Sequence, residues 1–197
     1  MPRTPKLLNK KYPKIFYRIG AISLQWNTAD YYLEQLLKSY MMFEDEWADI
    51  FLDTWGNEAR GTVLNRIIKV SEPDPAFQDY ALHITKVFEI CRENRNFVVH
   101  GIVRKIEKDS FIIERFSRRQ QSRSDFLITL PILERVESSI ILLCAHLRFL
   151  MHNNAKVSDL LGKRSPLPDK PPLPDRLTNT QKPIPRSAAP PPESYEE

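Results

Sequence analysis

Glycine and cysteine are scarce in this chain of 197 residues, which has five glycines and two cysteines. So few glycines leave no glycine-rich phosphate loop, which excludes P-loop and dinucleotide-binding mechanisms. Cys91 and Cys144 stand apart in apolar runs without a CxxC pair, which excludes a disulfide framework and a zinc knuckle and favours a reducing, cytoplasmic compartment. The N-terminus has no apolar stretch of the signal-peptide type, and no apolar run is long enough to span a bilayer, so we expect neither secretion nor membrane insertion.

Patterns typical of metal sites and hydrolases are also missing. The carboxylates within residues 44–49 are contiguous and have no histidine nearby, which is typical of a solvated turn or a helix start. His83, His146 and His152 have no carboxylate or cysteine partner at helical spacing. A Ser/His/Asp triad lacks its strand-turn-helix context. We therefore predict no metal and no cofactor.

Proline is abundant but unevenly placed: ten of the 16 prolines lie between Pro166 and Pro192. Because proline removes an amide donor and fixes φ, we predict that residues 163–197 form a disordered, proline-rich tail. Pro171 and Pro174 match the PxxP form of ligands for polyproline-binding grooves, which offers an alternative role for the tail. Residues 1–13 are predicted to be a flexible basic N-terminus, which leaves one domain over 14–162.

Apolar residues in this domain recur at steps of three and four, which predicts amphipathic helices. The predicted helices cover residues 14–42, 58–70, 76–100 and 125–152. N-cap signals at 27–30 could split the first helix, and Pro131 allows the last to begin near Leu130.

Residues 102–117 are β-branched and aromatic around a polar turn, which predicts a β-hairpin. The expected fold is all-α: a small antiparallel bundle of four to five helices with a short β-hairpin insert and a disordered tail.

Arg95, Asn96 and His100 form the main candidate site, at the end of the predicted helix 76–100. At about 100° per residue, Arg95 and His100 lie roughly 140° apart on a straight helix and cannot meet. Gly101 favours a helix end directly after His100, where the chain can unwind and turn the ring inward. A second copy facing the first across a dimer would also bring Arg and His together.

Histidine can exchange a proton near neutral pH, and the arginine fork fits phosphate oxygens. RNA supplies its own nucleophile in the 2′-hydroxyl, so such a pair could cleave RNA without a metal, whereas DNA would be spared. The other interpretation is structural: His100 caps a helix end, and Arg95 forms a surface ion pair with Glu89 or Glu93.

At these residues the sequence resembles the HEPN superfamily (higher eukaryotes and prokaryotes nucleotide-binding), whose signature is an arginine, four to six residues, then a histidine. The order of helices over roughly residues 15–155 is also similar. The resemblance implies a homodimeric, metal-independent endoribonuclease of toxin-antitoxin or phage-defence systems, with Arg95 and His100 catalytic and Asn96 supportive. Some HEPN members carry a tyrosine two positions after the histidine, where this chain has Ile102. Others are inactive scaffolds or nucleotide-binding modules, which leaves a non-catalytic interaction module as the alternative.

Residues 92–123 hold nine basic and four acidic side chains, a local surplus of positive charge beside the candidate site. Such a surplus attracts a phosphate backbone. We predict that five of these cations contact RNA: Arg92, Arg104, Lys105, Arg118 and Arg119. A solvated hairpin whose lysines and arginines protect its edges is the alternative.

Overall fold

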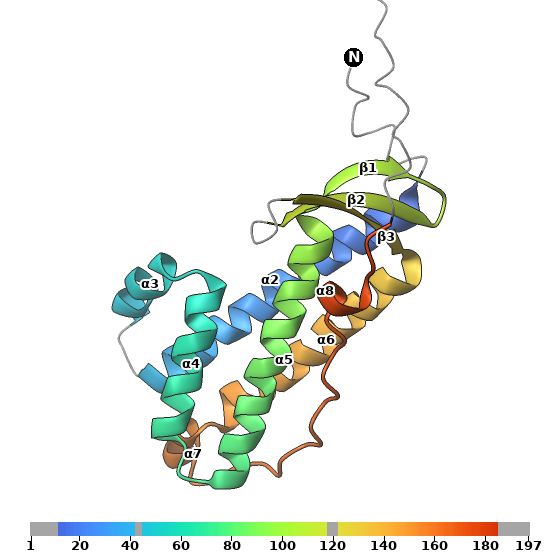
Figure 1. Cartoon of the computed structure of the whole chain (residues 1–197). Helices are drawn as coiled ribbons and strands as arrows, with labels where there is room; N and C mark the ends of the chain where they lie inside the picture. Colours follow the sequence, from blue (N-terminus) through green and yellow to red (C-terminus); the bar gives the residue numbers. More distant parts are fainter. Residues whose placement is uncertain (1–11, 42–44, 118–121, 185–197) are drawn as a thin grey trace, which may run out of the picture.

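The computed structural model describes residues 12–41, 45–117 and 122–184, and in this part the chain is mostly helical with one small sheet (Figure 1). The long helices are α2 (Pro13–Met41), α4 (Asn57–Ser71), α5 (Pro75–Val99) and α6 (Leu130–Asn153). The first three agree with the predicted helices to within one residue at each end, and α2 runs unbroken through 27–30. None of the helices described here is both long and apolar enough to cross a membrane.

Among the long helices, α5 runs against its neighbours, whereas α2 and α6 run in the same direction. Arg18 early in α2 binds Glu137 early in α6, and Ser39 near the end of α2 accepts a bond from Asn154, which follows α6. The predicted antiparallel bundle is therefore correct for α5 but not for α2 and α6. The reason is α3 (Asp45–Thr54), which carries the chain back so that α4 repeats the direction of α2 (Figure 1).

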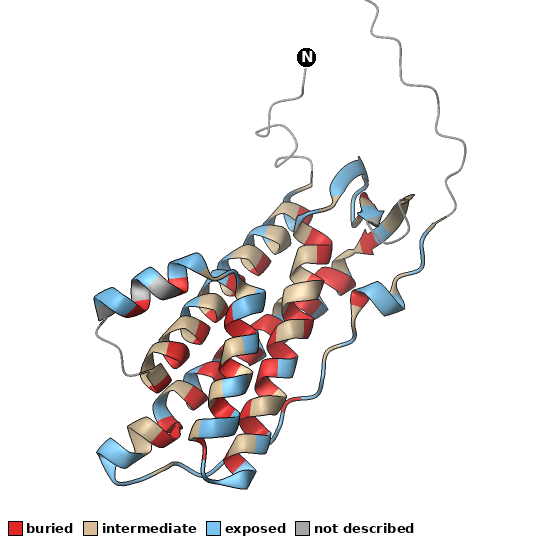
Figure 2. Cartoon of the chain, turned by 60° about the vertical axis from the view of Figure 1, so that its left-hand side comes forward, coloured by how far each residue is buried: buried red, intermediate tan, exposed pale blue. Residues whose placement is uncertain are grey.

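The core is a single apolar cluster shared by the four long helices and the inner face of the sheet. Figure 2 shows the buried positions as stripes on the faces that the helices turn toward one another. Trp26 of α2 and Phe88 of α5 meet near its middle, with ring centroids 5.0 Å apart. This amphipathic pattern is the physical reason why helix periodicity could be recognised in the sequence.

The predicted hairpin is a three-stranded antiparallel sheet in the order β1 (Ile102–Ile106), β2 (Ser110–Ser117) and β3 (Ser122–Thr129). Residues 125–129, predicted to begin the last helix, belong to β3, and α6 begins at Leu130, the alternative that Pro131 allowed. The alternation of apolar and polar residues in β3 was not apparent in the sequence, because Leu127 on the outer face is apolar although it is 41% exposed. Phe126 and Ile128 pack inward against the core.

Residues 163–184, here called the strap, correct the prediction of a disordered tail. The strap is extended, as its prolines require, but it lies along α5 and α6 (Figure 1). Asn94 of α5 holds its backbone twice: the amide donates to the Asp175 carbonyl, and the amide oxygen accepts from Leu177, each at 2.8 Å. Leu177 opens the short helix α8 (Leu177–Thr180) and is buried.

Further contacts hold the middle and the end of the strap. Pro171 is buried, and its carbonyl lies 2.7 Å from Nε2 of His83. The Ile184 amide donates to the Asp125 carbonyl on β3 at 2.9 Å. The PxxP segment therefore packs on its own bundle. Residues 185–197 of the predicted tail and residues 1–11 of the predicted N-terminus lie outside the described residues.

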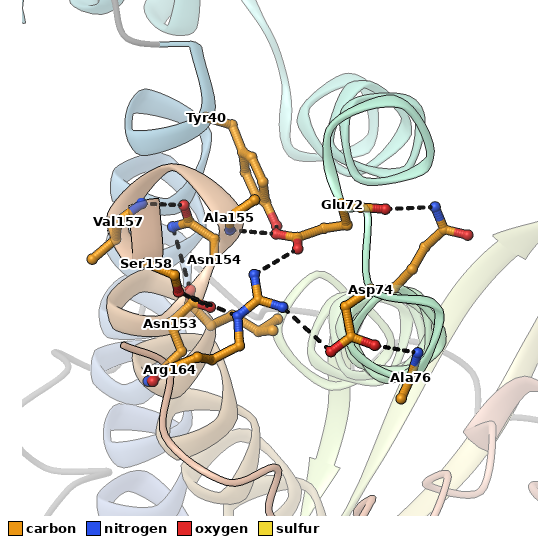
Figure 3. A network of polar contacts seen from close by, with 12 residues as sticks. Tyr40, Glu72, Asp74, Ala76, Asn153, Asn154, Ala155, Val157, Ser158 and Arg164 are labelled. Carbon is orange, nitrogen blue, oxygen red and sulfur yellow. Dashed lines mark hydrogen bonds and ion pairs between the residues drawn. The ribbon is translucent and has the colours of Figure 1, made fainter. Parts of the chain in front are cut away.

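A buried polar cluster around Glu72, at the end of α4, anchors the start of the strap (Figure 3). Oε1 of Glu72 accepts bonds from the Tyr40 hydroxyl at 2.5 Å and from the Ala155 amide, which begins α7 (Ala155–Leu161), at 2.8 Å. Oε2 accepts from Arg164 of the strap at 2.9 Å. Burial and the bond to Glu72 raise the pKa of Tyr40. One carboxylate thus ties together α2, α4, α7 and the strap.

Candidate functional site

The candidate site lies where α5 meets the sheet, and the sequence determines both ends of this helix. Asp74 caps the start by accepting a bond from the Ala76 amide at 2.9 Å, and Pro75 occupies the first turn. The helix ends at Val99. His100 leaves the helical conformation, with φ −101° and ψ 9°. The predicted helix end beside Gly101 is therefore confirmed.

Gly101 is needed at this end because β2 approaches it closely. A Cβ atom at residue 101 would lie 2.8 Å from Cβ of Ile113, a side chain fully buried in the core. The glycine thus lets the sheet pack directly against the end of α5, and this packing sets where His100 turns away from the helix.

Arg95 and His100 meet at this helix end. Nη1 of Arg95 lies 2.7 Å from Nε2 of His100 and also donates to Oδ1 of Asn96 at 3.0 Å. The structure therefore brings all three predicted site residues together within one chain. The ion pair of Arg95 with Glu89 or Glu93, expected from the structural interpretation, is absent among the described contacts.

The direction of this contact follows from the chemistry of its groups. A guanidinium can only donate, so Nε2 of His100 is the acceptor. His100 is exposed and Arg95 is half-buried. Nε of Arg95 is buried without a hydrogen-bond partner in the described structure. The site thus offers an accessible proton acceptor beside a cation that is held in place.

Asp30 of α2 is an acidic group that interacts electrostatically with Arg95. Burial raises the pKa of Asp30, and the positive charges of Arg60 and Arg95 oppose that shift. Asp30 lies 3.5 Å from Nη1 of Arg60, its direct ionic partner. Arg95 therefore has an acidic neighbour but keeps the Nη1 contact with His100.

The predicted RNA-binding cations do not gather at the site as free charges. Arg92 binds Glu58 of α4 at 3.1 Å, Arg104 binds Glu114 at 3.2 Å, and Lys105 binds Glu107 at 2.8 Å. The bond to Glu107 raises the pKa of Lys105, and the same bond lowers the pKa of Glu107. Arg118 and Arg119 lie outside the described residues.

Sequence reasoning missed Asn94 and Glu72, which position the strap, and Arg115, which lines a pocket at the sheet. Asn94 is a polar residue on the apolar side of α5, and this break in the hydrophobic pattern was the one available signal. Glu72 stands next to Pro73 in a predicted turn, where a carboxylate is normally exposed. Only the tertiary fold shows that it is buried.

No group of three or more His, Cys, Asp or Glu side chains in the described ranges is arranged to hold a metal ion. Comparison of the chain with protein families, curated proteins and solved structures finds no match.

Replacing Gly101 by alanine is expected to lower the free energy of unfolding by about 1–3 kcal/mol, because its methyl group would overlap the buried Ile113 side chain. The matched control is Gly61→Ala on α4, where an added Cβ would be 4.0 Å from Cδ1 of Phe88, an ordinary van der Waals distance. Chemical denaturation of both variants measures the effect. Equal stability of Gly101→Ala and the wild type would show that β2 does not require this glycine.

Proposed function

We propose that the chain is a metal-independent endoribonuclease of the HEPN type, with Arg95, Asn96 and His100 as its active site. The observation that carries the proposal is the 2.7 Å contact between Nη1 of Arg95 and Nε2 of an exposed His100. Two side chains that a straight helix would hold apart meet at its end, beside an amide that orients the arginine. RNA cleavage through the 2′-hydroxyl needs this combination of a proton acceptor and a phosphate-binding cation.

In the proposed reaction, the substrate phosphate takes over the Arg95 donor that now binds Nε2. The freed Nε2 of His100 removes the proton of the 2′-hydroxyl, and the 2′-oxygen forms a bond to phosphorus. The bond from phosphorus to the 5′-oxygen breaks, and this oxygen takes up a proton from solvent water, while His100 returns its proton to the solvent. Arg95 stabilises the charge on the non-bridging oxygens, and Asn96 holds its guanidinium in place. The products end in a 2′,3′-cyclic phosphate and a 5′-hydroxyl.

The proposal includes a homodimer, and an exposed face of α2 supports it. Tyr17, Leu24 and Tyr31 are 69%, 66% and 55% exposed and recur every seven residues. Gly20 and Asn27 complete a spacing of alternating three and four residues, the pattern of helices that pair along one stripe. The stripe ends next to Asp30, which interacts electrostatically with Arg95. A partner on this face would therefore lie near the site.

The variant Leu24→Asp is expected to convert the dimer to a monomer, because it places a charge in the middle of an apolar interface. Leu160→Asp on α7 is the matched control, since Leu160 is 77% exposed and lies away from the stripe. Sedimentation velocity distinguishes the species. A wild-type monomer, or a Leu24→Asp variant that still dimerises, would contradict this interface.

By resemblance, the activity belongs to a cytoplasmic toxin or phage-defence protein that acts on cellular RNA, with an antitoxin or other protein as a possible partner. Growth arrest on overexpression of the wild type but not of Arg95→Ala would support this role.

A second candidate, a non-catalytic interaction module, is favoured by one observation. Three of the predicted RNA-binding cations, Arg92, Arg104 and Lys105, are already paired with carboxylates. In such a module, the contact between Arg95 and His100 only stabilises the end of α5, and the bundle binds a nucleotide or a partner protein.

The two candidates differ in a simple assay. Purified protein with EDTA is incubated with an RNA oligonucleotide pool and with a matched pool whose 2′-hydroxyls are methylated. The enzyme proposal expects cleavage of the first pool alone, with cyclic phosphate ends. Cleavage of both pools, or dependence on an added divalent ion, would exclude the proposed chemistry.

A further inference from the structure

A pocket of about 370 Å³ lies between the inner face of the sheet, α5 and the strap. Arg115 of β2 and Phe126 of β3 come from the sheet, Phe97 comes from α5, and Gln181 comes from the strap. We call it the Arg115 pocket. Its volume is near the lower end of the range of about 300–1,000 Å³ that is usual for small-molecule sites.

Strand register explains why this pocket faces the bundle. Arg115 pairs with Ser124, and Ile113 pairs with Phe126, so these side chains share one face of the sheet. Ile113 on this face is fully buried in the core. The core does not extend to the end of β2, where the same face of the sheet lines the pocket. Phe116, the next residue of β2, also borders the pocket, but strand alternation turns its side chain, which is 56% exposed, to the other face of the sheet.

Arg115 carries its charge into this pocket without an acidic partner. In the described ranges no carboxylate pairs with its guanidinium, and its partner there is the ring of Phe97, 4.6 Å from the arginine Cζ to the ring centroid. Burial lowers the pKa of Arg115, which shows that its charge is partly removed from water. The sheet's other described arginines, Arg104 and Arg123, both bind Glu114. Arg115 is therefore available to an anion.

The other walls determine which anion fits. Phe126 lies edge-on to Phe97 with centroids 5.0 Å apart, and both residues line the pocket. Ser124 of β3 and Thr178 and Gln181 of the strap add hydroxyl and amide groups to the lining. A flat ring can pack against the phenyl groups, and its nitrogen and oxygen atoms can hydrogen-bond to these polar groups. The guanidinium fork binds phosphate oxygens in pairs.

We propose that the Arg115 pocket binds a nucleotide unit, with its base against the aromatic walls and its phosphate on Arg115. The same chemistry is present in a free mononucleotide and in the terminal nucleotide of an RNA strand. On α5, Phe97 and Arg95 lie about 200° apart, so the pocket and the Arg95 site occupy different sides of the helix. The proposal therefore does not depend on the proposed cleavage reaction.

Isothermal titration of the full chain with adenosine 5′-monophosphate tests this site, with adenosine and inorganic phosphate as separate arms. We expect the monophosphate to bind more tightly than either fragment. Arg115→Gln is expected to weaken its binding by about tenfold or more, the usual effect of losing a charge-assisted hydrogen bond. Phe116→Ala, whose ring lies on the other face of the sheet, should change the affinity little, and Arg148→Gln on the exposed side of α6 is the matched control.

A second measurement locates the ligand and its source. In NMR spectra of the folded protein, the monophosphate should shift the amide signals of Arg115, Ser124 and Gln181. Arg115→Lys retains the charge without the fork and keeps the test valid if Arg115→Gln unfolds. A short RNA with a 5′-phosphate that binds more tightly than the monophosphate identifies an RNA end as the source, and the reverse order identifies a free nucleotide.

Equal affinity of the wild type and Arg115→Gln would overturn the proposal. So would adenosine or phosphate binding as tightly as the monophosphate, no binding of any of the four common ribonucleoside monophosphates at millimolar concentration, or shifts confined to Arg95 and His100. Cleavage of RNA by the Arg115→Gln variant does not bear on this result. A failure of the pocket and a failure of the proposed enzyme are thus distinguishable.

Discussion

The variant His100→Ala is expected to slow RNA cleavage by about 10²- to 10⁴-fold, the usual contribution of a positioned general acid or base. The physical reason is that Nε2 of His100 is the exposed proton acceptor beside Arg95. The effect should appear in the cleavage rate and not in stability, because the exposed ring contributes little to the core. Rates are measured on the RNA pool in EDTA, together with the thermal unfolding midpoint.

His152→Ala is the matched control for this prediction, since His152 is also exposed and ends a long helix, α6. It should cleave RNA at the wild-type rate. A His100→Ala variant that keeps its fold and cleaves as fast as this control would exclude His100 from the chemistry.

The second large effect is expected at Glu72, where an alanine should lower the free energy of unfolding by about 3–5 kcal/mol. The substitution leaves the Tyr40 hydroxyl, the Ala155 amide and the Arg164 guanidinium without their shared acceptor in the interior (Figure 3). An unsatisfied buried charge is costly, whereas the same carboxylate on the surface would contribute little. Urea denaturation measures the loss.

Glu134→Ala is the control for Glu72→Ala, because Glu134 pairs with Arg18 at 3.0 Å while half of its side chain is exposed. Its loss should cost about 0–1 kcal/mol. Glu72→Gln keeps the hydrogen-bonding shape without the charge and should be intermediate. Equal stability of Glu72→Ala and Glu134→Ala would show that the cluster does not hold α2, α4, α7 and the strap together.

The sequence predicted the parts of the fold in which local pattern and tertiary packing agree. The α5 helix carries a cap at Asp74, a regular apolar stripe and a glycine after its last residue, so both ends could be located. A helix that stops before Gly101 and frees His100 to turn was one of the two predicted ways for Arg95 and His100 to meet, the other being a second copy across a dimer, and the structure has the first.

The prediction was wrong where residues far apart in the sequence determine the local structure. Residues 125–129 of β3 were assigned to a helix because the apolar Leu127 on the outer face interrupts the alternation of apolar and polar residues that Phe126 and Ile128 begin. The strap was assigned to a disordered tail because proline-rich segments bury little of their own surface. Here α5 supplies hydrogen bonds that hold the strap in place, since Asn94 binds the strap backbone from 81 residues away. Composition alone does not reveal such a partner.

The ion pairs of the candidate RNA-binding cations could not be predicted from the sequence either. Glu114 is 3% exposed and binds both Arg104 and Arg123, although Glu114 and Arg104 lie on different strands. A count of charges along the chain treats all of them as available, whereas strand pairing neutralises some and leaves Arg115 without an acidic partner in the described ranges. Register, which a sequence specifies weakly for short exposed strands, is the missing information.

Arg95 and His100 are proposed to act as one RNA-cleaving unit. The most direct test is the cleavage rate of Arg95→Ala, His100→Ala and the double variant on the RNA pool in EDTA. Residues that act as a unit lose activity together, so we predict that the double variant is no slower than the slower single variant. Undiminished cleavage by either single variant, or losses that multiply in the double variant, would contradict the claim.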